Sequence, residues 1–208
     1  MTFEFHKMHG AGNDFVLIDC RERDLTIDPL LAARIADRHL GIGCDQILVL
    51  QNPVDPAHRA RYEIWNSDGS PAAQCGNGAR CIGLYLEMND GAGSEQFSVE
   101  SPSGVVKMQR CDDGEYELEM GTPRFGPEAV PVDLEPVDGS YELDSPWGKL
   151  EFGAVSMGNP HLLVLVPDIN DEQIPQIGSY LSTHEAFPDG CNAGFAQLTG
   201  EGSIQLRV

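Results

Sequence analysis

Short segments rich in apolar and β-branched residues recur along the chain, and many of them alternate apolar with polar positions. Alternation with a period of two, bounded by glycine and proline turns, is typical of half-buried β-strands. Three other segments repeat their apolar residues with helical spacing. The pattern therefore predicts a mixed α+β fold in which strands outnumber helices. The predicted strands cover residues 3–8, 15–19, 47–51, 62–65, 96–100, 105–110, 116–120, 149–157, 161–166, 194–198 and 203–208.

The first helical pattern carries its own start and stop signals. Asp28 can cap the helix N-terminus and Pro29 suits the first helical position, whereas Gly41 is expected to end the helix. Because only one face is apolar, we expect this helix to lie on the surface of a sheet. Its apolar positions are Leu31, Ala32, Ile35, Ala36 and Leu40.

The second helical pattern, residues 76–88, is apolar around almost its whole circumference after the first turn. A helix that lacks a polar face is buried, and a sheet curled around it is the arrangement we expect. The third pattern, residues 171–181, is a weaker helix signal because Pro175 and Gly178 interrupt it. The pattern therefore predicts a surface helix, a buried helix and a weaker third helix.

The 208 residues are enough for one sizeable core or for two small domains. No low-complexity tract, linker-length charge block or tandem repeat divides the chain. A Gly-Thr-Pro turn at residues 121–123 follows a predicted strand. We therefore place a domain boundary there, between residues 1–121 and 122–208.

The charge balance excludes several classes of function. The chain has 13 Lys and Arg against 33 Asp and Glu, a net charge of −20, which disfavours binding to nucleic acid or to an anionic membrane surface. No apolar run approaches the ~20 residues that cross a bilayer. The N-terminal segment does not resemble a secretory signal. We therefore expect a cytoplasmic protein whose six cysteines are reduced.

The strongest candidate for chemistry is Cys75, which comes directly before the predicted buried helix in the run Cys-Gly-Asn-Gly. Gly76 and Gly78 allow close backbone approach, and the free N–H groups of a helix N-terminus bind anions. We expect this environment to lower the pKa of the Cys75 thiol, making it a base or a nucleophile. A half-buried structural cysteine fits the same pattern. A metal site shared with Cys81 does not have zinc-ligand spacing.

Five loops carry a neutral amide where a strand or helix begins or ends. The loop at residues 9–15 contains Gly-x-Gly, but it lacks the third glycine and the following helix of a dinucleotide site. Each loop alone is also compatible with a plain turn. Together they predict a pocket lined by neutral amides, which suits a zwitterion because an amide both donates and accepts. The loops cover residues 9–15, 41–46, 66–81, 157–161 and 190–192.

With these motifs in their order, the sequence resembles the diaminopimelate epimerases over nearly the whole chain. The resemblance implies an α+β fold of two pseudo-symmetric domains, each a curled mixed or antiparallel sheet around a central helix, with the active site in the cleft between them. It also implies a cytoplasmic isomerase of lysine and peptidoglycan-precursor synthesis that uses no cofactor or metal. The motifs that carry it cover residues 9–15, 41–46, 66–70, 75–81, 158–161 and 192.

The resemblance also implies a mechanism, in which two cysteines face opposite sides of the substrate α-carbon and interconvert LL- and meso-diaminopimelate. Cys75 corresponds to the first of them, and Gly76 and Asn77 correspond to residues that receive the substrate near the reacting centre. A small amino acid is the expected partner, and a homodimer is compatible with the sequence. The remaining implied substrate contacts are Asn13, Gln46, Asn66, Asn159 and Asn192.

The chain departs from the family pattern after the strand that ends at Val208. Family members continue through a Glu-Arg pair to a second cysteine that opens the second domain's central helix. The cysteines outside the Cys75–Cys81 motif, at positions 20, 44, 111 and 191, lack a following Gly-Asn or Gly-Thr. We therefore expect a fragment with an incomplete second domain, inactive and poorly folded alone because an apolar sheet face stays uncovered.

Four other functions fit parts of the pattern. Proline or hydroxyproline racemases and carboxylate-dependent isomerases share the implied fold, although the intact Cys-Gly-Asn-Gly motif and the Asn13 and Asn66 loops argue against both. A non-catalytic amino-acid-binding protein would bind its ligand without exchanging the α-proton. A redox protein using Cys75 would need a disulfide partner, which no motif supplies.

Overall fold

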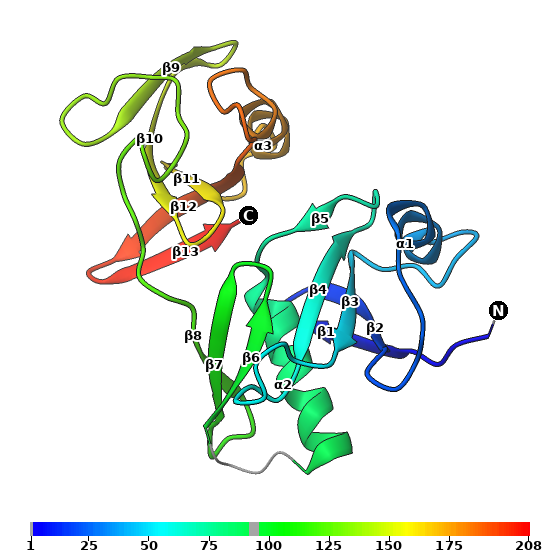
Figure 1. Cartoon of the computed structure of the whole chain (residues 1–208). Helices are drawn as coiled ribbons and strands as arrows, with labels where there is room; N and C mark the ends of the chain where they lie inside the picture. Colours follow the sequence, from blue (N-terminus) through cyan, green and yellow to red (C-terminus); the bar gives the residue numbers. More distant parts are fainter. Residues whose placement is uncertain (1, 92–95) are drawn as a thin grey trace. The chain divides into compact units, whose positions relative to one another are not determined.

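The computed structural model describes residues 2–91 and 96–208, and the chain forms two compact units, Met1–Met120 and Gly121–Val208 (Figure 1). Within the described residues there are thirteen strands and three helices. The strands form two sheets, one in each unit. The predicted α+β fold is therefore confirmed. None of the helices in the described ranges combines the length and the apolarity that crossing a lipid bilayer requires.

The first unit contains an eight-stranded sheet with the order β1-β2-β3-β4-β6-β7-β8, and β5 pairs with β4 off this path. The pairs β2–β3 and β4–β6 are parallel, and the others are antiparallel. The strands are β1 (His6–Gly10), β2 (Asn13–Asp19), β3 (Gln46–Gln51), β4 (Arg61–Asn66), β5 (Pro71–Ala72), β6 (Phe97–Ser101), β7 (Gly104–Arg110) and β8 (Tyr116–Glu119).

Helix α2 (Gly76–Asp90) is the centre of this unit, as its apolar circumference predicts. It contacts both edge strands, β1 and β8, as well as β2 and β3, so the sheet curls around it (Figure 1). Gly83 lets the helix approach the sheet, since a Cβ there would meet Met108 and Tyr116 at 3.0 Å. The C-terminus is capped by Gly91 at φ +67°. The buried residues on α2 are Gly78, Ala79, Cys81, Ile82, Gly83, Tyr85 and Leu86.

Helix α1 (Pro29–Ala36) packs on the other face of the same sheet, against Val16, Ile18, Ile47 and Val49. Strands β2 and β3 are therefore buried on both faces, which explains their unbroken apolar runs.

Helix α1 begins as predicted, with the Asp28 carboxylate accepting from the Leu31 N–H at 2.8 Å, but the prediction that it runs to Gly41 is wrong. The helix stops at Ala36 because the Asp37 carboxylate accepts from the backbone N–H groups of His39 and Leu40, at 2.7 and 2.8 Å, and turns the chain. Leu40, expected on the apolar face, is exposed.

The second unit contains a five-stranded sheet with the order β13-β12-β11-β10-β9, in which only the pair β11–β12 is parallel within the described residues. Helix α3 (Ile174–Ser182) covers one face of this sheet through Ile174 and Leu181. Pro175 lies in its first turn, where it starts the helix rather than breaking it. The strands are β9 (Tyr141–Ser145), β10 (Gly148–Ser156), β11 (Pro160–Leu165), β12 (Asn192–Gly200) and β13 (Ser203–Arg207).

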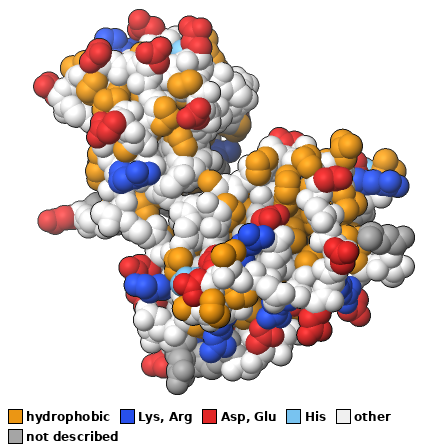
Figure 2. All heavy atoms as spheres, viewed as in Figure 1, with side chains coloured by type: hydrophobic (Ala, Val, Ile, Leu, Met, Phe, Trp, Pro, Cys, Tyr) orange, Lys and Arg blue, Asp and Glu red, His pale blue; other side chains and the backbone are white. Residues whose placement is uncertain are grey.

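The opposite face of the second sheet carries apolar side chains that are exposed. Register places Leu165 beside Ala196 and Ala196 beside Leu206 on this face, and both leucines are more than half exposed, as is Ile204. Elsewhere acidic, basic and apolar side chains are interspersed over the surface seen in Figure 2. An exposed apolar sheet face is unusual in a stable monomer.

Candidate active site

Cys75 is the N-cap residue of α2, with extended backbone dihedrals of φ −151° and ψ 105°. Its Sγ accepts from the backbone N–H of Gly78 at 3.4 Å. The sulfur thus takes the place that a serine or aspartate oxygen takes at an ordinary helix N-cap. Cys75 is half-buried and packs against the core of the first unit. A proton-transfer group here lies in the field of the helix N-terminus.

The expected lowering of the Cys75 pKa is not what the structure gives. Burial raises the pKa of the Cys75 thiol above its ordinary value, and this outweighs the opposing effect of the Gly78 and Asn77 backbone N–H groups and of the Arg80 charge. Desolvation penalises the thiolate more than the helix N-terminus stabilises it. Burial likewise raises the pKa of Cys81 to about 11. Within the first unit, burial therefore favours the protonated thiol of Cys75 over the thiolate.

Two glycines bring the N-terminus of α2 close to its surroundings. A Cβ at Gly78 would lie 2.9 Å from Leu48 Cδ2, and a Cβ at Gly76 would lie 2.8 Å from the sulfur of Met120. At these distances the neighbouring side chain must shift, which is harder for Leu48 because it is fully buried in the core. Gly78 therefore favours the close approach of the helix start to strand β3, next to the Cys75 thiol.

Three of the predicted amides lie at one end of three neighbouring strands. Asn13 begins β2, Gln46 begins β3 and Asn66 ends β4, and register pairs Phe15 with Gln46 and Gln46 with Asn66. The side chains of Gln46 and Asn66 are hydrogen-bonded, with Gln46 Nε2 donating to Asn66 Oδ1 at 2.9 Å.

The same end of the sheet meets the first turn of α2. The Asn77 side chain donates from Nδ2 to Asn13 Oδ1 at 2.7 Å. A Cβ at Gly10 would lie 3.6 Å from the Asn77 carbonyl oxygen, so β1 also borders this turn. The structure thus brings six predicted site residues together in the first unit, namely Asn13, Gln46, Asn66, Cys75, Gly76 and Asn77.

An ionic cluster that sequence reasoning missed holds this end of the sheet in place. The Asp14 N–H donates to the Asp45 carboxylate and the Asp45 N–H donates to the Asp14 carboxylate, both at 3.0 Å. Arg38 Nη2 contacts the two carboxylates at 2.6 and 2.8 Å, and Lys7 Nζ lies 2.6 Å from Asp14. Hydrogen bonding to Arg38 holds the pKa of Asp14 well below its usual range.

Asp14 and Asp45 directly adjoin Asn13 and Gln46 in the sequence. An aspartate beside each of two site amides was the signal that could have revealed the cluster.

The two remaining predicted residues lie in the second unit, also at one end of neighbouring strands. Asn159 Oδ1 is 2.9 Å from the Nε2 of His161, and Asn192 Nδ2 donates to the Pro160 carbonyl at 3.1 Å. His161 and Asn192 are register partners in the parallel pair β11–β12. Burial lowers the pKa of His161, so the imidazole is neutral at physiological pH. His161 was not among the predicted site residues.

A cavity of about 290 Å³ borders the first turns of α2, and its lining includes Gly10, Asn77, Arg80, Cys81 and Tyr116. Its volume is near the lower end for a small-molecule site. The cavity adjoins the amide cluster because Asn77 belongs to both.

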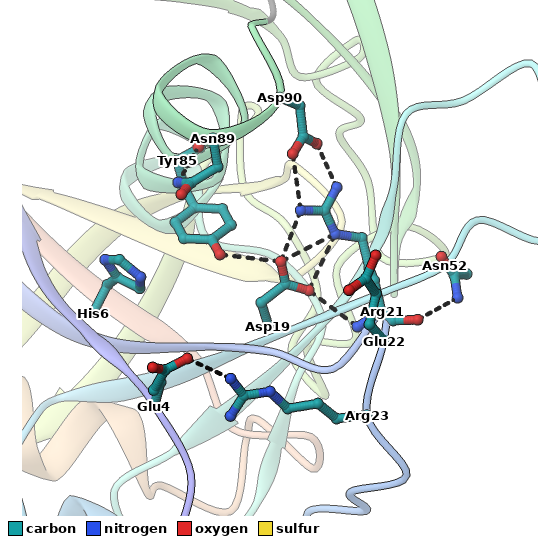
Figure 3. A pocket seen from close by; sticks show the side chains of 10 residues that line it. All are labelled: Glu4, His6, Asp19, Arg21, Glu22, Arg23, Asn52, Tyr85, Asn89 and Asp90. Carbon is teal, nitrogen blue, oxygen red and sulfur yellow. Dashed lines mark hydrogen bonds and ion pairs between the residues drawn. The ribbon is translucent and has the colours of Figure 1, made fainter.

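A larger cavity, of about 410 Å³, lies at the last turns of α2 (Figure 3). There Tyr85 donates to Asp19 at 3.0 Å, and Arg21 pairs with Asp19 and Asp90. These groups satisfy one another, and none of the predicted site residues lines this cavity. Size alone therefore does not mark it as the reaction site. No group of three or more His, Cys, Asp or Glu within residues 2–91 and 96–208 is arranged to hold a metal ion.

Solved structures of similar fold include an amino-acid racemase and an epimerase. A probable proline racemase from Agrobacterium radiobacter K84, solved with bound carbonate, matches with a TM-score of 0.71 at 18% identity, over 99% of this chain and 69% of that one. A hydroxyproline epimerase from Agrobacterium vitis matches with a TM-score of 0.70 at 17% identity, over 97% of this chain and 68% of that one. At these identities the similarity establishes the fold.

Sequence comparison identifies the family. The diaminopimelate epimerase family profile matches residues 5–126. The chain is 44% identical to a diaminopimelate epimerase of Xanthomonas axonopodis pv. citri (strain 306), over 98% of this chain and 72% of the relative. It is 38% identical to one of Thioalkalivibrio sulfidiphilus (strain HL-EbGR7), over all of this chain and 75% of the relative. The chain is therefore an amino-acid epimerase, acting on a small molecule, and it belongs to the diaminopimelate epimerase family.

Proposed function

We propose that this protein contributes to the interconversion of LL- and meso-diaminopimelate, with Cys75 transferring the proton on one face of the substrate α-carbon. The observation that carries the proposal is a half-buried cysteine at the N-cap of the central helix, beside a cluster of neutral amides. The names of the relatives at 38–44% identity supply the substrate. Asn13, Gln46, Asn66, Gly76, Asn77, Asn159 and Asn192 are the proposed substrate contacts.

The protonation state of Cys75 assigns its first step. Because burial favours the thiol, Cys75 enters the reaction as an acid that gives its proton to the α-carbon after a base on the opposite face has removed the original one. The thiolate left behind accepts from the N–H groups of Asn77 and Gly78, which also oppose the effect of burial. In the reverse direction this thiolate is the base. The opposite base is proposed to be a second cysteine, which no other motif of this chain supplies.

The helix N-terminus is also proposed to stabilise the charge that develops when the substrate α-proton is removed. Removing the α-proton of an amino acid places negative charge on its α-carboxylate, and backbone N–H groups aimed at that carboxylate lower the barrier by several kcal/mol in a dry site. The backbone N–H of Gly76 belongs to the first turn of α2, where N–H groups have no partner within the helix. Neither a cofactor nor a metal takes part in this proposal.

The test is exchange of the substrate α-proton with deuterated water, followed by NMR, together with optical inversion. The chain is assayed as it is and as a chimera that adds the part of the Xanthomonas relative that this chain does not match. We expect inversion by the chimera, and loss of both exchange and inversion in Cys75→Ser. The control Cys191→Ser, whose thiol bonds the Leu181 carbonyl at 3.4 Å, is expected to keep both.

Three outcomes would contradict the proposal: a folded chimera that binds diaminopimelate without exchange, equal exchange in Cys75→Ser, or faster exchange of proline than of diaminopimelate. The first indicates a binding protein, the second a different base, and the third a proline racemase. The cytoplasmic location, the homodimer and the assignment of residues 1–121 and 122–208 as the two epimerase domains stay predictions.

A further inference from the structure

A directed chain of hydrogen bonds starts at Asp68 and runs through the candidate site. Its carboxylate Oδ1 accepts from the Ser70 hydroxyl at 2.6 Å and from the Ser70 backbone N–H at 2.8 Å. An ionised carboxylate only accepts, so the hydroxyl proton of Ser70 points to Asp68 and the hydroxyl oxygen is left as an acceptor. Asn66 Nδ2 donates to that oxygen at 3.0 Å. The amide of Asn66 thereby has a fixed orientation.

The orientation of Asn66 passes to Gln46. With its NH₂ group turned to Ser70, Asn66 presents Oδ1 to Gln46, whose Nε2 donates to it at 2.9 Å. The Gln46 carbonyl, Oε1, is then buried without a hydrogen-bond partner among the described residues. A buried acceptor without a donor is costly. This first chain therefore leaves one acceptor that calls for a donor from a ligand.

A second chain of hydrogen bonds starts at the cation of Arg80 and ends in a donor instead of an acceptor. The guanidinium of Arg80 only donates, and its Nη2 donates to Asn77 Oδ1. Asn77 then presents its NH₂ group to Asn13, donating to Oδ1 at 2.7 Å. With its carbonyl occupied, Asn13 retains its own NH₂ group as a donor. The chain from Arg80 thus ends in the NH₂ group of Asn13, which makes no hydrogen bond to another described residue, whereas the chain from Asp68 ends in the buried acceptor of Gln46.

The two ends lie on neighbouring strands. Asn13 stands two residues before Phe15, which is the register partner of Gln46 in the parallel pair β2–β3. The cross-bonds between Asp14 and Asp45 hold these strand starts together. Asn13, Phe15 and Gln46 share one face of the pair, and a donor and an acceptor on that face match a zwitterion, whose carboxylate needs a donor and whose ammonium needs an acceptor.

We propose that Arg80 and the Ser70–Asp68 pair are positioning residues that set the polarity of the substrate site. Arg80 orients Asn13, through Asn77, to donate to a substrate carboxylate. Ser70 and Asp68 orient Gln46, through Asn66, to accept from a substrate ammonium. The inference deepens the proposed function and rests on it, because it takes a zwitterionic amino acid as the ligand.

Each of these residues could affect binding in another way, and the test must distinguish that effect from positioning. The Arg80 charge alone would attract a carboxylate without orienting any amide. Ser70 follows Gly69, whose φ is +85° and whose added Cβ would lie 2.2 Å from the Pro29 carbonyl, so a change at Ser70 could act by loosening this turn against α1. Arg80→Gln keeps a donor without the charge, and Ser70→Thr keeps the hydroxyl in the same turn.

The first measurement follows the side-chain amide resonances in ¹⁵N-labelled full chain without ligand. Ser70→Ala is expected to shift the NH₂ signals of Asn66 and Gln46 and to speed their exchange with water, and Ser70→Thr to restore them. Arg80→Ala is expected to shift the NH₂ signals of Asn77 and Asn13 and to speed their exchange with water. In Arg80→Gln these signals are expected to lie closer to those of the wild type. Unchanged amide signals in the folded alanine variants would overturn the proposal, and no turnover is needed to see this.

The second measurement uses pimelate, which has the carboxylates without the amines, and cadaverine, which has the amines without the carboxylates. Loss of one oriented hydrogen bond weakens binding roughly 2- to 12-fold. Arg80→Ala is expected to weaken the binding of pimelate by this factor without changing the binding of cadaverine. Ser70→Ala is expected to weaken the binding of cadaverine without changing that of pimelate. Equal losses of both probes, or an Arg80→Gln variant as poor as Arg80→Ala, would overturn the positioning role.

The two proposals fail in different ways. If the chimera exchanges the α-proton but the side-chain amide signals do not change in the Ser70 and Arg80 variants, only the positioning roles are wrong. If the amides and the two probes respond as expected but no α-proton exchanges in the chimera, the site is oriented for a zwitterion and the proposed epimerisation is wrong.

Discussion

The sheets of the two units use similar strands in different surroundings. In the first unit β2 is covered on both faces, so that neighbouring residues such as Val16 and Leu17 are both 0% exposed. In the second unit β11 alternates, with Leu162 at 2% and Leu165 at 63%. Both strands are apolar runs in the sequence. Apolar composition therefore indicates burial only where a second layer covers the sheet.

The comparison predicts its largest effect on the central helix. Leu86→Ala removes a fully buried side chain of α2 and is expected to lower the free energy of unfolding by about 2–5 kcal/mol. Leu84→Ala on the same helix, where the side chain is 41% exposed, is the matched control and should cost clearly less. Urea denaturation followed by circular dichroism measures both. Equal losses would mean that the sheet does not enclose α2 in solution.

Two glycine substitutions compare a position where the backbone is tightly packed with one where it has open space beside it. Gly78→Ala places a methyl group 2.9 Å from Leu48 Cδ2 and is expected to destabilise the protein by about 1–3 kcal/mol through overpacking. Gly153→Ala in the second sheet meets no atom within 4 Å, so it should be neutral or slightly stabilising. Thermal denaturation of the two variants checks the difference. A neutral Gly78→Ala would show that α2 starts farther from β3.

The ionic cluster of the first unit predicts a pH-dependent effect of smaller size. Since the folded pKa of Asp14 lies below its ordinary value of 3.8, ionisation of Asp14 stabilises the fold above that pH, and the stabilisation is lost as pH falls through the folded pKa. Asp14→Asn should therefore be less stable than the wild type at pH 7, and the two should converge as pH drops below 3.8. Urea titrations at several pH values measure this, with Asp138→Asn as control. A gap that widens in acid would contradict it.

The smallest effect on stability is expected on the exposed sheet face. Leu165→Ser should change the free energy of unfolding by no more than about 0.5 kcal/mol, as is usual at exposed positions. It should nevertheless reduce binding of an apolar dye and concentration-dependent association, because it breaks a contiguous apolar face. Light scattering and dye fluorescence are the measurements. A large loss of stability would show that this face is buried in solution.

Much of the fold follows from the sequence because the relevant forces are local. The cap at Asp28 and the apolar circumference of residues 76–88 predict two of the helices and the burial of one. The stop at Gly41 fails because Asp37 competes for the backbone one turn earlier. Strand β9 was missed, although Tyr141 and Leu143 alternate with polar residues, since its burial depends on the rest of the second unit.

The candidate site, too, could be predicted from the sequence only in part. Cys75 and the amides could be named from motifs, but the hydrogen bonds that orient them join residues far apart in the sequence, as Gln46 and Asn66 show. The direction of the Cys75 pKa was wrong because local reasoning saw the helix N-terminus and not the burial. The contacts of Arg80 with Asn77 and of Ser70 with Asn66 are visible only in the coordinates.

The parallel pairing of β2 with β3 has a consequence for how this site tolerates change. Parallel neighbours require a crossover, here the segment containing α1. Outside α1 and Arg38, residues could be added to or removed from that crossover without altering the pairing of Phe15 with Gln46, because the register of the two strands sets it. Within each motif a single inserted residue would turn the amide to the other face of its strand. The loops of the connection can therefore vary in length, whereas α1, Arg38 and the two strand starts are constrained by their contacts.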